Sequence, residues 1–226
     1  MGPVSTAEFY REIIRQCQKQ YGAKYDEDYP EIFIYNLPIP DVVEGLKTPE
    51  KTLEVLVNGA KKLASIGIDF MTIPCNTVQY FYEDIQAKLE APLLNIVKES
   101  AMKLKSLGYS KIGILATETT IKTKLYEKIF SELGITLFSP QNQSIVNNVI
   151  LNILAGKRSE SDKNNLLQII TELKEQGAEA VLLGCTDLSF FLEKQVSSLP
   201  IYDSTIILAE MTVKYAITSN SQQDTL

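Results

Sequence analysis

Apolar and polar residues follow one another along the chain in two distinct patterns. Apolar residues at a spacing of three to four predict helices over residues 6–20, 48–66, 78–88, 98–107, 120–133, 144–154, 161–176, 190–195 and 206–217. Short continuous apolar runs predict strands over residues 31–35, 68–73, 92–96, 111–115, 135–138, 177–183 and 200–203. Continuous runs are typical of parallel strands that are covered on both faces. Helices and strands in this alternating order predict an α/β fold with parallel sheets.

An internal repeat divides this pattern into two halves. The segments Pro74–Thr77 and Gly184–Asp187 each place a cysteine directly after an apolar strand, and the two cysteines are 110 positions apart. The same separation relates Gly67 to Gly177, ahead of these strands. At 226 residues the chain is long enough for two compact lobes of about 100 to 110 residues each. The repeat therefore predicts two pseudo-symmetric lobes.

The repeat also predicts that the first lobe lacks one strand. Residues 116–126 align with the start of the chain, so that Tyr126 corresponds to Tyr10 and Ile129 to Ile13. In the second half this segment follows the strand 111–115, whereas in the first half no strand precedes it. We therefore expect lobe one, which comprises residues 1–98 and the last helix at about 205–218, without its opening strand. Lobe two comprises residues 99–204.

Composition argues against several classes of function. The net charge is −6, and the basic residues form no clustered basic face, which argues against binding to nucleic acid. Three cysteines are too few for a disulfide framework and indicate a reducing, cytoplasmic location. The sequence has no apolar stretch of about 18 residues, so we expect no membrane span. Histidine is absent, so cysteine, aspartate, glutamate, lysine or tyrosine must carry any proton transfer, and we expect no metal site.

The two repeated cysteines are the candidate catalytic residues. Cys75 and Cys185 lie where a parallel strand ends and a helix is predicted to begin, and backbone N–H groups at such a junction stabilise a thiolate. A single cysteine at a strand end is also compatible with a small buried apolar side chain. Two equivalent thiols suggest that both face one cavity, where one removes a proton from a carbon and the other adds one. Cys17 continues the apolar face of a helix, and we expect it in the core.

Polar side chains near both cysteines are candidates for binding a carboxylate. They are Asn76, Thr77 and Thr186, together with the cluster Thr117, Thr119 and Thr120 that follows the strand 111–115. The same residue types also cap helices and form turns, so the sequence leaves both roles open. Lys157, in a polar turn, is the candidate counter-charge for an anionic substrate.

These motifs resemble those of the cofactor-independent aspartate/glutamate racemase family. The resemblance covers the whole chain and includes the two cysteine motifs, Met1-Gly2-Pro3, Pro38-Ile39-Pro40-Asp41 and Leu115-Ala116-Thr117. It implies two Rossmann-like lobes related by a pseudo-dyad, an active site between them and commonly a homodimer. It also implies a two-base reaction on an amino acid, without pyridoxal phosphate, in which Cys75 and Cys185 are the acid/base pair. The implied substrate site is lined by Met1, Asn76, Thr77, Thr117, Thr120, Lys157 and Thr186.

The resemblance favours aspartate or glutamate as the substrate, and two positions bear on that choice. Gln79 stands where the family usually has histidine, and Val42 stands where a basic residue often grips an acidic side chain. Two alternatives stay open. One is a related cysteine-dependent racemase or isomerase, such as a hydantoin racemase or a maleate isomerase-like enzyme. The other is a truncated, non-catalytic protein that only binds a ligand.

Overall fold

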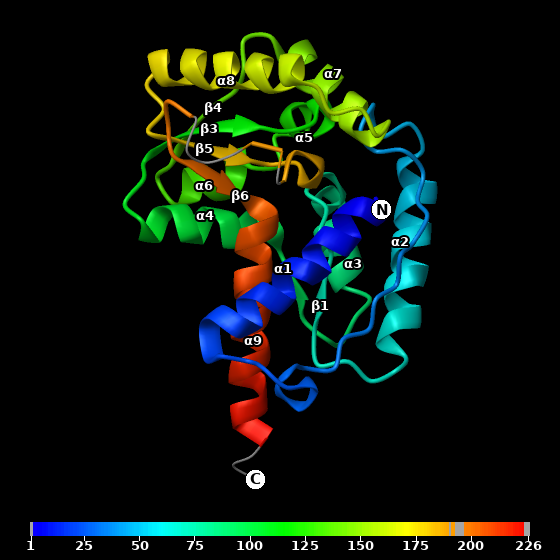
Figure 1. Ribbon diagram of the computed structural model, residues 1–226. Helices are drawn as coiled ribbons and strands as arrows, with labels where there is room; N and C mark the ends of the chain where they lie inside the picture. The colour runs from blue at the N-terminus through cyan, green and yellow to red at the C-terminus, as the bar shows by residue number, and fades with distance from the viewer. Residues whose placement is uncertain (1, 190, 193–196, 224–226) are drawn as a thin grey trace.

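The chain folds into two parallel sheets that are flanked by helices (Figure 1). The computed structural model describes residues 2–189, 191–192 and 197–223. The larger sheet has the strand order β4-β3-β5-β6, and the smaller sheet pairs β1 with β2. The strands are β1 (Met71–Thr72), β2 (Leu93–Leu94), β3 (Lys111–Leu115), β4 (Thr136–Phe138), β5 (Ala180–Leu183) and β6 (Ile201–Asp203). Every ladder among the described residues is parallel, which confirms the predicted α/β fold with two lobes.

The two sheets are built in the same way. In the smaller sheet the backbone N–H of Met71 donates to Pro92 O at 2.8 Å. In the larger sheet the N–H of Val181 donates to Pro200 O at 2.9 Å. Met71 and Val181 are 110 positions apart, and the two prolines are 108 apart. The pair β1-β2 therefore corresponds to the pair β5-β6, as the repeat predicts.

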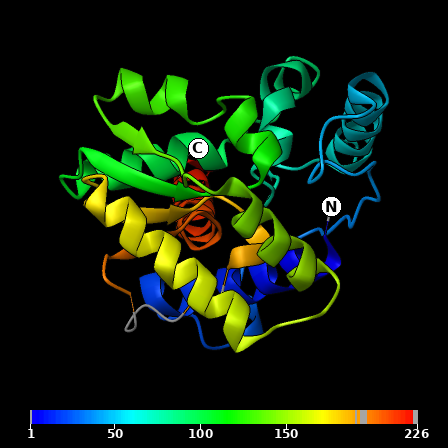
Figure 2. The ribbon, with the colours of Figure 1, turned by 90° about the horizontal axis from the view of Figure 1, so that it is seen from above.

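Helices cover both faces of the larger sheet. α7 and α8 lie on one face, and α4 and α6 lie on the other (Figures 1 and 2). The helices are α1 (Pro3–Tyr21), α2 (Pro49–Ala64), α3 (Tyr82–Gln86), α4 (Ile96–Ser106), α5 (Glu118–Lys122), α6 (Glu127–Glu132), α7 (Gln143–Leu154), α8 (Glu160–Glu175) and α9 (Ser204–Gln223). Short 3-10 turns are η1 (Asp26–Asp28), η2 (Thr77–Phe81) and η3 (Thr186–Leu188). Within the described part of the chain, no helix combines the length and the hydropathy that a bilayer span requires.

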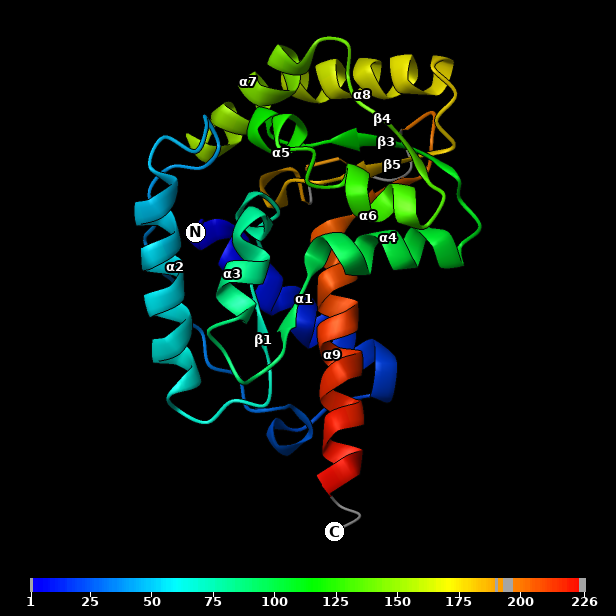
Figure 3. The same cartoon turned by 180° about the vertical axis from the view of Figure 1, so that it is seen from behind.

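The last helix, α9, packs against the first. Figure 3 shows α9 running from the larger sheet past α4 and along α1. Gln20 Nε2 of α1 donates to Glu210 O of α9 at 2.9 Å, and Lys103 of α4 forms an ion pair with the Glu210 carboxylate at 2.7 Å. The rings of Phe70, ahead of β1, and Tyr215 of α9 have their centroids 4.8 Å apart. Helix α9 therefore connects elements of both lobes.

One buried apolar cluster extends across both lobes. It combines Phe9 and Ile13 of α1 with Ile112 of β3, Leu182 of β5 and Leu208 of α9. A second cluster lies between β5 and the helices α7 and α8, and a third lies between α2 and β1. The two lobes therefore share part of their hydrophobic core. The predicted boundaries at residues 98 and 205, with α9 assigned to lobe one, stay a prediction.

Three predicted elements differ in the structure. Residues 31–35, predicted as a strand, are extended but pair with no strand among the described residues, because no neighbouring strand lies beside them. The predicted helix 78–88 is divided into η2 and α3. The predicted helix 120–133 is divided into α5 and α6, because Lys124 has a left-handed conformation, with φ 52°, that ends the helical path. The predicted helix 190–195 falls mostly outside the described residues.

Candidate active site

Both candidate cysteines lie at the carboxyl end of a parallel strand. Cys75 follows β1 and is half-buried, and Cys185 follows β5 and is buried. A 3-10 turn comes next in each case, η2 after Cys75 and η3 after Cys185. In both turns the backbone N–H groups two and three positions after the cysteine favour the thiolate form. The equivalence of the two sites thus extends to the hydrogen bonds around each sulfur.

Burial dominates the charge state of both thiols. It raises the pKa of Cys75, and it raises the pKa of Cys185 well above the ordinary value. The carboxylate of Asp187 raises the pKa of both thiols further, and negative charge at Cys75 also raises the pKa of Cys185. Since such interactions weaken with distance, the two sulfurs and the Asp187 carboxylate lie in one small region. The structure therefore brings together the two cysteines that the repeat pairs.

Asp187 connects Cys185 to the first helix. The Cys185 thiol donates to Asp187 Oδ2 at 3.7 Å, and the Ser5 hydroxyl of α1 donates to Asp187 Oδ1 at 2.9 Å. Burial raises the pKa of Asp187, and these two hydrogen bonds lower it. Neither Ser5 nor Asp187 is among the site residues predicted from the sequence, although Asp187 stands within the second cysteine motif. Ser5 lies 182 positions from Asp187, so no local pattern could have linked the two.

Removing the charge of Asp187 is expected to make both thiols easier to ionise. In the native protein the ionised carboxylate disfavours a second negative charge nearby, so it raises the pKa of both thiols and makes the thiolates harder to form. In Asp187→Asn the pH midpoint for alkylation of Cys75 by iodoacetamide, followed by peptide mass spectrometry, should fall by about one unit. Asp84→Asn removes an exposed carboxylate of α3 and should leave the midpoint unchanged. A midpoint that stays the same or rises in Asp187→Asn would contradict the assignment.

Three buried threonine hydroxyls, contributed by both lobes, form a closed cluster. The Oγ1 atoms of Thr77 and Thr117 are 3.1 Å apart. Thr120 Oγ1 lies 3.0 Å from each of the other two. Thr117 also caps α5, because its Oγ1 accepts the backbone N–H of Thr120 at 3.1 Å. Helix capping and a donor cluster therefore coexist here, whereas Thr119 donates to Val43 O at 3.1 Å.

A second buried network joins the lobes through Asn76. The Tyr126 hydroxyl donates to Asn76 Oδ1, and Asn76 Nδ2 donates to Ser204 Oγ at 3.1 Å. Burial raises the pKa of Tyr126 far above its ordinary value, so the hydroxyl keeps the proton that it donates. The oxygen of the Asn76 amide is thus bound by lobe two, and its nitrogen binds the start of α9. Neither Tyr126 nor Ser204 is among the site residues predicted from the sequence, because only the tertiary fold brings them to Asn76.

The remaining predicted site residues take no part in these networks. Thr186 follows Cys185 and is buried, and Lys157 lies in the exposed turn between α7 and α8. Met1 lies outside the described residues. In the described ranges, no group of three or more histidine, cysteine, aspartate or glutamate side chains is placed to hold a metal ion. Cys17 is fully buried in α1, which confirms its expected place in the core.

The sequence is similar to those of known proteins along most of its length. The family profile described as Asp/Glu/Hydantoin racemase matches residues 1–212. The chain is 35% identical over 214 residues to the broad specificity amino-acid racemase RacX of Bacillus subtilis (strain 168). The matched region covers 94% of this chain and 93% of that protein.

Two solved structures extend the comparison to the whole fold. The aspartate racemase of Picrophilus torridus superposes with a TM-score of 0.81 at 27% identity, covering 96% of this chain and 90% of that one. An aspartate racemase homologue from Pyrococcus horikoshii OT3 gives 0.79 at 26% identity, covering 95% and 94%. The chain belongs to the Asp/Glu/Hydantoin racemase family and is an isomerase of the racemase type.

Proposed function

We propose that the protein interconverts the L and D forms of aspartate or glutamate by transferring the α-proton between Cys75 and Cys185. The observation that carries this proposal is the equivalent placement of two thiols at the ends of β1 and β5, under the shared influence of Asp187. A thiolate and a thiol are by themselves a base and an acid, so the proposed reaction uses no cofactor. A cytoplasmic location, as the cysteine content indicates, and a homodimer, as the family resemblance implies, complete the proposal.

In the proposed reaction one cysteine begins as a thiolate and the other as a thiol. The thiolate takes the proton from the α-carbon, and the electron pair of the broken C–H bond delocalises into the α-carboxylate. The second thiol then gives its proton to the opposite face of the same carbon. The configuration at carbon is inverted, and the two cysteines end with exchanged protonation states. The reverse reaction therefore starts from the other cysteine.

Asp187 supports an assignment of the starting roles. The Cys185 thiol donates a hydrogen bond to this carboxylate, and burial together with the Asp187 charge keeps the pKa of Cys185 well above the ordinary value. The pKa of Cys75 is raised as well, but Cys75 is half-buried and has no such bond to the carboxylate. In the free enzyme we therefore assign the thiolate to Cys75 and the thiol to Cys185.

The threonine cluster supports a place for the α-carboxylate of the substrate. Without substrate the hydroxyls of Thr77, Thr117 and Thr120 satisfy one another. Each hydroxyl can instead donate to a carboxylate oxygen, and hydrogen bonds to a charged acceptor are stronger than those between neutral groups. Negative charge on the carboxylate grows as the α-proton leaves, so these donors stabilise the transition state most.

The side chain of the substrate is a separate question, and one observation favours a second candidate. Val42 is buried and apolar, and Gln79 is buried, with Nε2 donating to Ile73 O at 3.4 Å. Neither position supplies a cation for an acidic side chain. The relative from Bacillus subtilis is named a broad specificity amino-acid racemase. A racemase that accepts neutral or basic amino acids is therefore the second candidate function.

Loss of the α-proton signal in D₂O tests both candidates. Purified protein is incubated with L-aspartate, L-glutamate, L-alanine or L-lysine in separate samples, and the α-proton resonance is followed by NMR. We expect the signal of aspartate or glutamate to disappear together with formation of the D enantiomer. Exchange confined to alanine or lysine would select the second candidate. If no amino acid of the panel exchanged its α-proton, the proposed reaction would be wrong.

A further inference from the structure

Three consecutive polar residues stand where β6 leads into α9 (Figure 1). They are Asp203, Ser204 and Thr205, and all three are buried. At the equivalent junction of β2 and α4 in lobe one, two of the three positions hold the aliphatic residues Ile96 and Val97. Burial of polar side chains is unfavourable unless hydrogen bonds compensate for it. These three residues, which we call the α9 junction, therefore need partners that their counterparts do not need.

Ser204 of the α9 junction binds the turn that follows Cys75. Its Oγ accepts a hydrogen bond from Asn76 Nδ2 at 3.1 Å. Asn76 comes directly after Cys75 and stands at the start of η2. The backbone N–H groups of Thr77 and Val78 in this turn favour the Cys75 thiolate. The contact with Ser204 therefore fixes the turn that carries the first sulfur and its backbone donors.

Asp203 and Thr205 bind the other cysteine turn. Cys185 and Ser189 flank η3, one at each end. The Ser189 hydroxyl donates to Asp203 Oδ1 at 2.9 Å and lies 2.7 Å from Thr205 Oγ1. Asp203 Oδ1 also accepts the backbone N–H of Thr205 at 2.8 Å, so the same carboxylate caps α9. Asp203 therefore connects the end of the Cys185 turn to the first residues of α9.

Hydrogen-bond donors surround the buried carboxylate of Asp203. Burial raises the pKa of Asp203, whereas hydrogen bonds from Ser189 and from the first backbone N–H groups of α9 lower it. The amino end of a helix also favours negative charge. Burial raises the pKa of Tyr126 as well, and negative charge at Cys185 and at Asp203 raises it further. The α9 junction therefore lies in the same region as the second sulfur.

Lobe one has no equivalent arrangement. Asn95, the counterpart of Asp203, accepts two backbone N–H groups of its own helix, at 2.9 and 3.1 Å. Within the described part of the chain, Asn95 forms no hydrogen bond with η2 or η3. Gln79, the counterpart of Ser189, donates instead to the backbone oxygen of Ile73 at 3.4 Å. Of the two junctions, it is therefore the one before α9 that binds both cysteine turns.

We propose that the α9 junction is a positioning element for racemisation: Ser204 holds η2, and Asp203 holds η3 through Ser189. The proposal rests on the proposed function, because it concerns how the two sulfurs are placed on opposite faces of one α-carbon. A displacement of a reacting group by about 1 Å can slow a reaction by about 10²-fold. Since separate contacts hold the two turns, each contact should affect one half of the proton transfer.

Ser189→Ala and Ser204→Ala test the two contacts separately. Exchange of the α-proton in D₂O is measured for both enantiomers of the amino acid that the parent racemises. The enantiomer that loses exchange in Cys185→Ser is the one that depends on Cys185. Ser189→Ala should slow exchange of this enantiomer about tenfold and that of the other less than about twofold, and Ser204→Ala should do the opposite. A merely structural defect would lower both rates together and leave their ratio unchanged.

Two substitutions of Asp203 test whether it acts through Ser189. Asp203→Ala removes the acceptor and should change the ratio of the two exchange rates as Ser189→Ala does. Asp203→Asn keeps an acceptor oxygen, as Asn95 does in lobe one, and should restore the parent ratio. If Asp203→Ala fails to fold, Ser189→Ala decides the same point, because it removes the donor of the same hydrogen bond.

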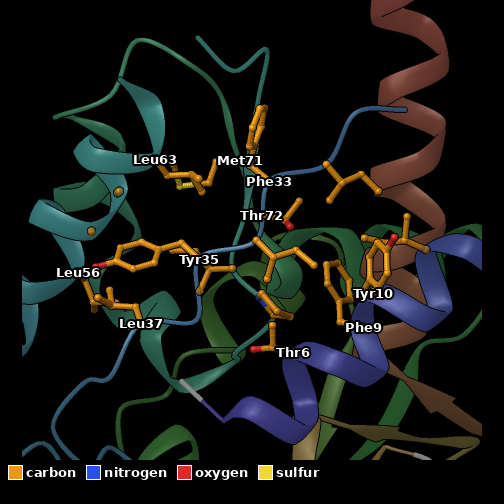
Figure 4. Close-up of a pocket in the computed structure, with 17 residues that line it drawn as sticks. Thr6, Phe9, Tyr10, Phe33, Tyr35, Leu37, Leu56, Leu63, Met71 and Thr72 are labelled. Atoms are coloured by element: carbon orange, nitrogen blue, oxygen red, sulfur yellow. The ribbon is translucent and has the colours of Figure 1, made fainter. Parts of the chain in front are cut away.

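Two control variants lower stability away from both turns. Asn95→Ala removes the cap of α4. Leu63→Ala shortens an apolar side chain of α2 that lines a cavity in lobe one, opposite Phe9 and Tyr10 of α1 (Figure 4). Both controls should lower the melting temperature and keep the parent ratio of the two exchange rates.

Three outcomes would overturn the proposal. The first is that Ser189→Ala and Ser204→Ala slow both enantiomers equally or slow neither. The second is that a control variant shifts the ratio as far as these two variants do. The third is that Asp203→Asn shifts the ratio as far as Asp203→Ala.

A parent protein that exchanges neither enantiomer of any amino acid would instead contradict the proposed function. Amide hydrogen exchange then decides whether the α9 junction holds the two turns. Faster exchange in η3 alone for Ser189→Ala, and in η2 alone for Ser204→Ala, would support separate contacts. Faster exchange in both turns or in neither would reject them.

Discussion

Replacing either Cys75 or Cys185 with serine is expected to lower kcat/KM for racemisation in both directions by about 10³-fold or more. A serine hydroxyl cannot replace a thiol as an acid or a base at neutral pH, and a positioned acid or base contributes about 10²- to 10⁴-fold. Because inversion needs a group on each face of the α-carbon, loss of either cysteine removes one half of the transfer. Formation of the D enantiomer, measured by chiral chromatography, checks the expected loss.

Proton exchange in D₂O separates the two halves of the reaction. A variant with one of the two cysteines is expected to exchange the α-proton of only one enantiomer. Cys75→Ser and Cys185→Ser should retain this exchange with opposite enantiomers. Cys17→Ala is the matched control, because this thiol is fully buried in α1 and is not part of the site. The control should racemise like the parent at temperatures well below its melting point. Racemisation by Cys75→Ser at the parent rate would rule out the two-cysteine mechanism.

The second largest effect is expected for Thr77→Val. The substitution keeps the shape of the side chain and removes a hydroxyl that lies within 3.1 Å of Thr117 Oγ1 and 3.0 Å of Thr120 Oγ1. A hydrogen bond to a charged group contributes about 1.5 to 3 kcal/mol, so kcat/KM should fall by about 10- to 150-fold. Since negative charge on the carboxylate grows in the transition state, we expect a decrease in kcat as well as an increase in KM.

Thr123→Val provides the comparison for this variant. Thr123 lies at the end of α5, and its hydroxyl donates to the backbone oxygens of Thr119 at 2.8 Å and Thr120 at 3.2 Å, not to a side-chain hydroxyl of the threonine cluster. Steady-state kinetics of this control should match the parent. If Thr77→Val kept the parent kcat/KM while circular dichroism showed an intact fold, the carboxylate would have to bind elsewhere.

The parts of the fold that depend on local pattern could be predicted from the sequence. Strand β3 has the predicted bounds, 111–115, because a continuous apolar run is buried on both faces. The positions of Cys75 and Cys185 at strand ends also follow from the repeat. By contrast, residues 31–35 have the composition of a strand but pair with no described strand. A ladder forms only where two segments lie side by side. Local pattern cannot show whether the second segment is present.

The site residues that could not be predicted from the sequence were missed for a different reason. Asn76 and Ser204 are 128 positions apart, and Ser5 and Asp187 are 182 apart, so each contact depends on how the lobes pack. Tyr126 also looks like an ordinary aromatic residue of the helical pattern, although its hydroxyl reaches Asn76. The one signal in the sequence is that the hydroxyl of a buried tyrosine needs a hydrogen-bond partner, and this signal does not identify the partner.

The contact between α1 and α9 determines the order in which the protein can be completed during synthesis. Helix α1 is translated long before α9, although its buried face shares one apolar cluster with Leu208 and Val213 of α9. Until α9 has been synthesised, the apolar face of α1 stays uncovered in the nascent chain. The apolar face of α1 can therefore be covered only after α9 has left the ribosome.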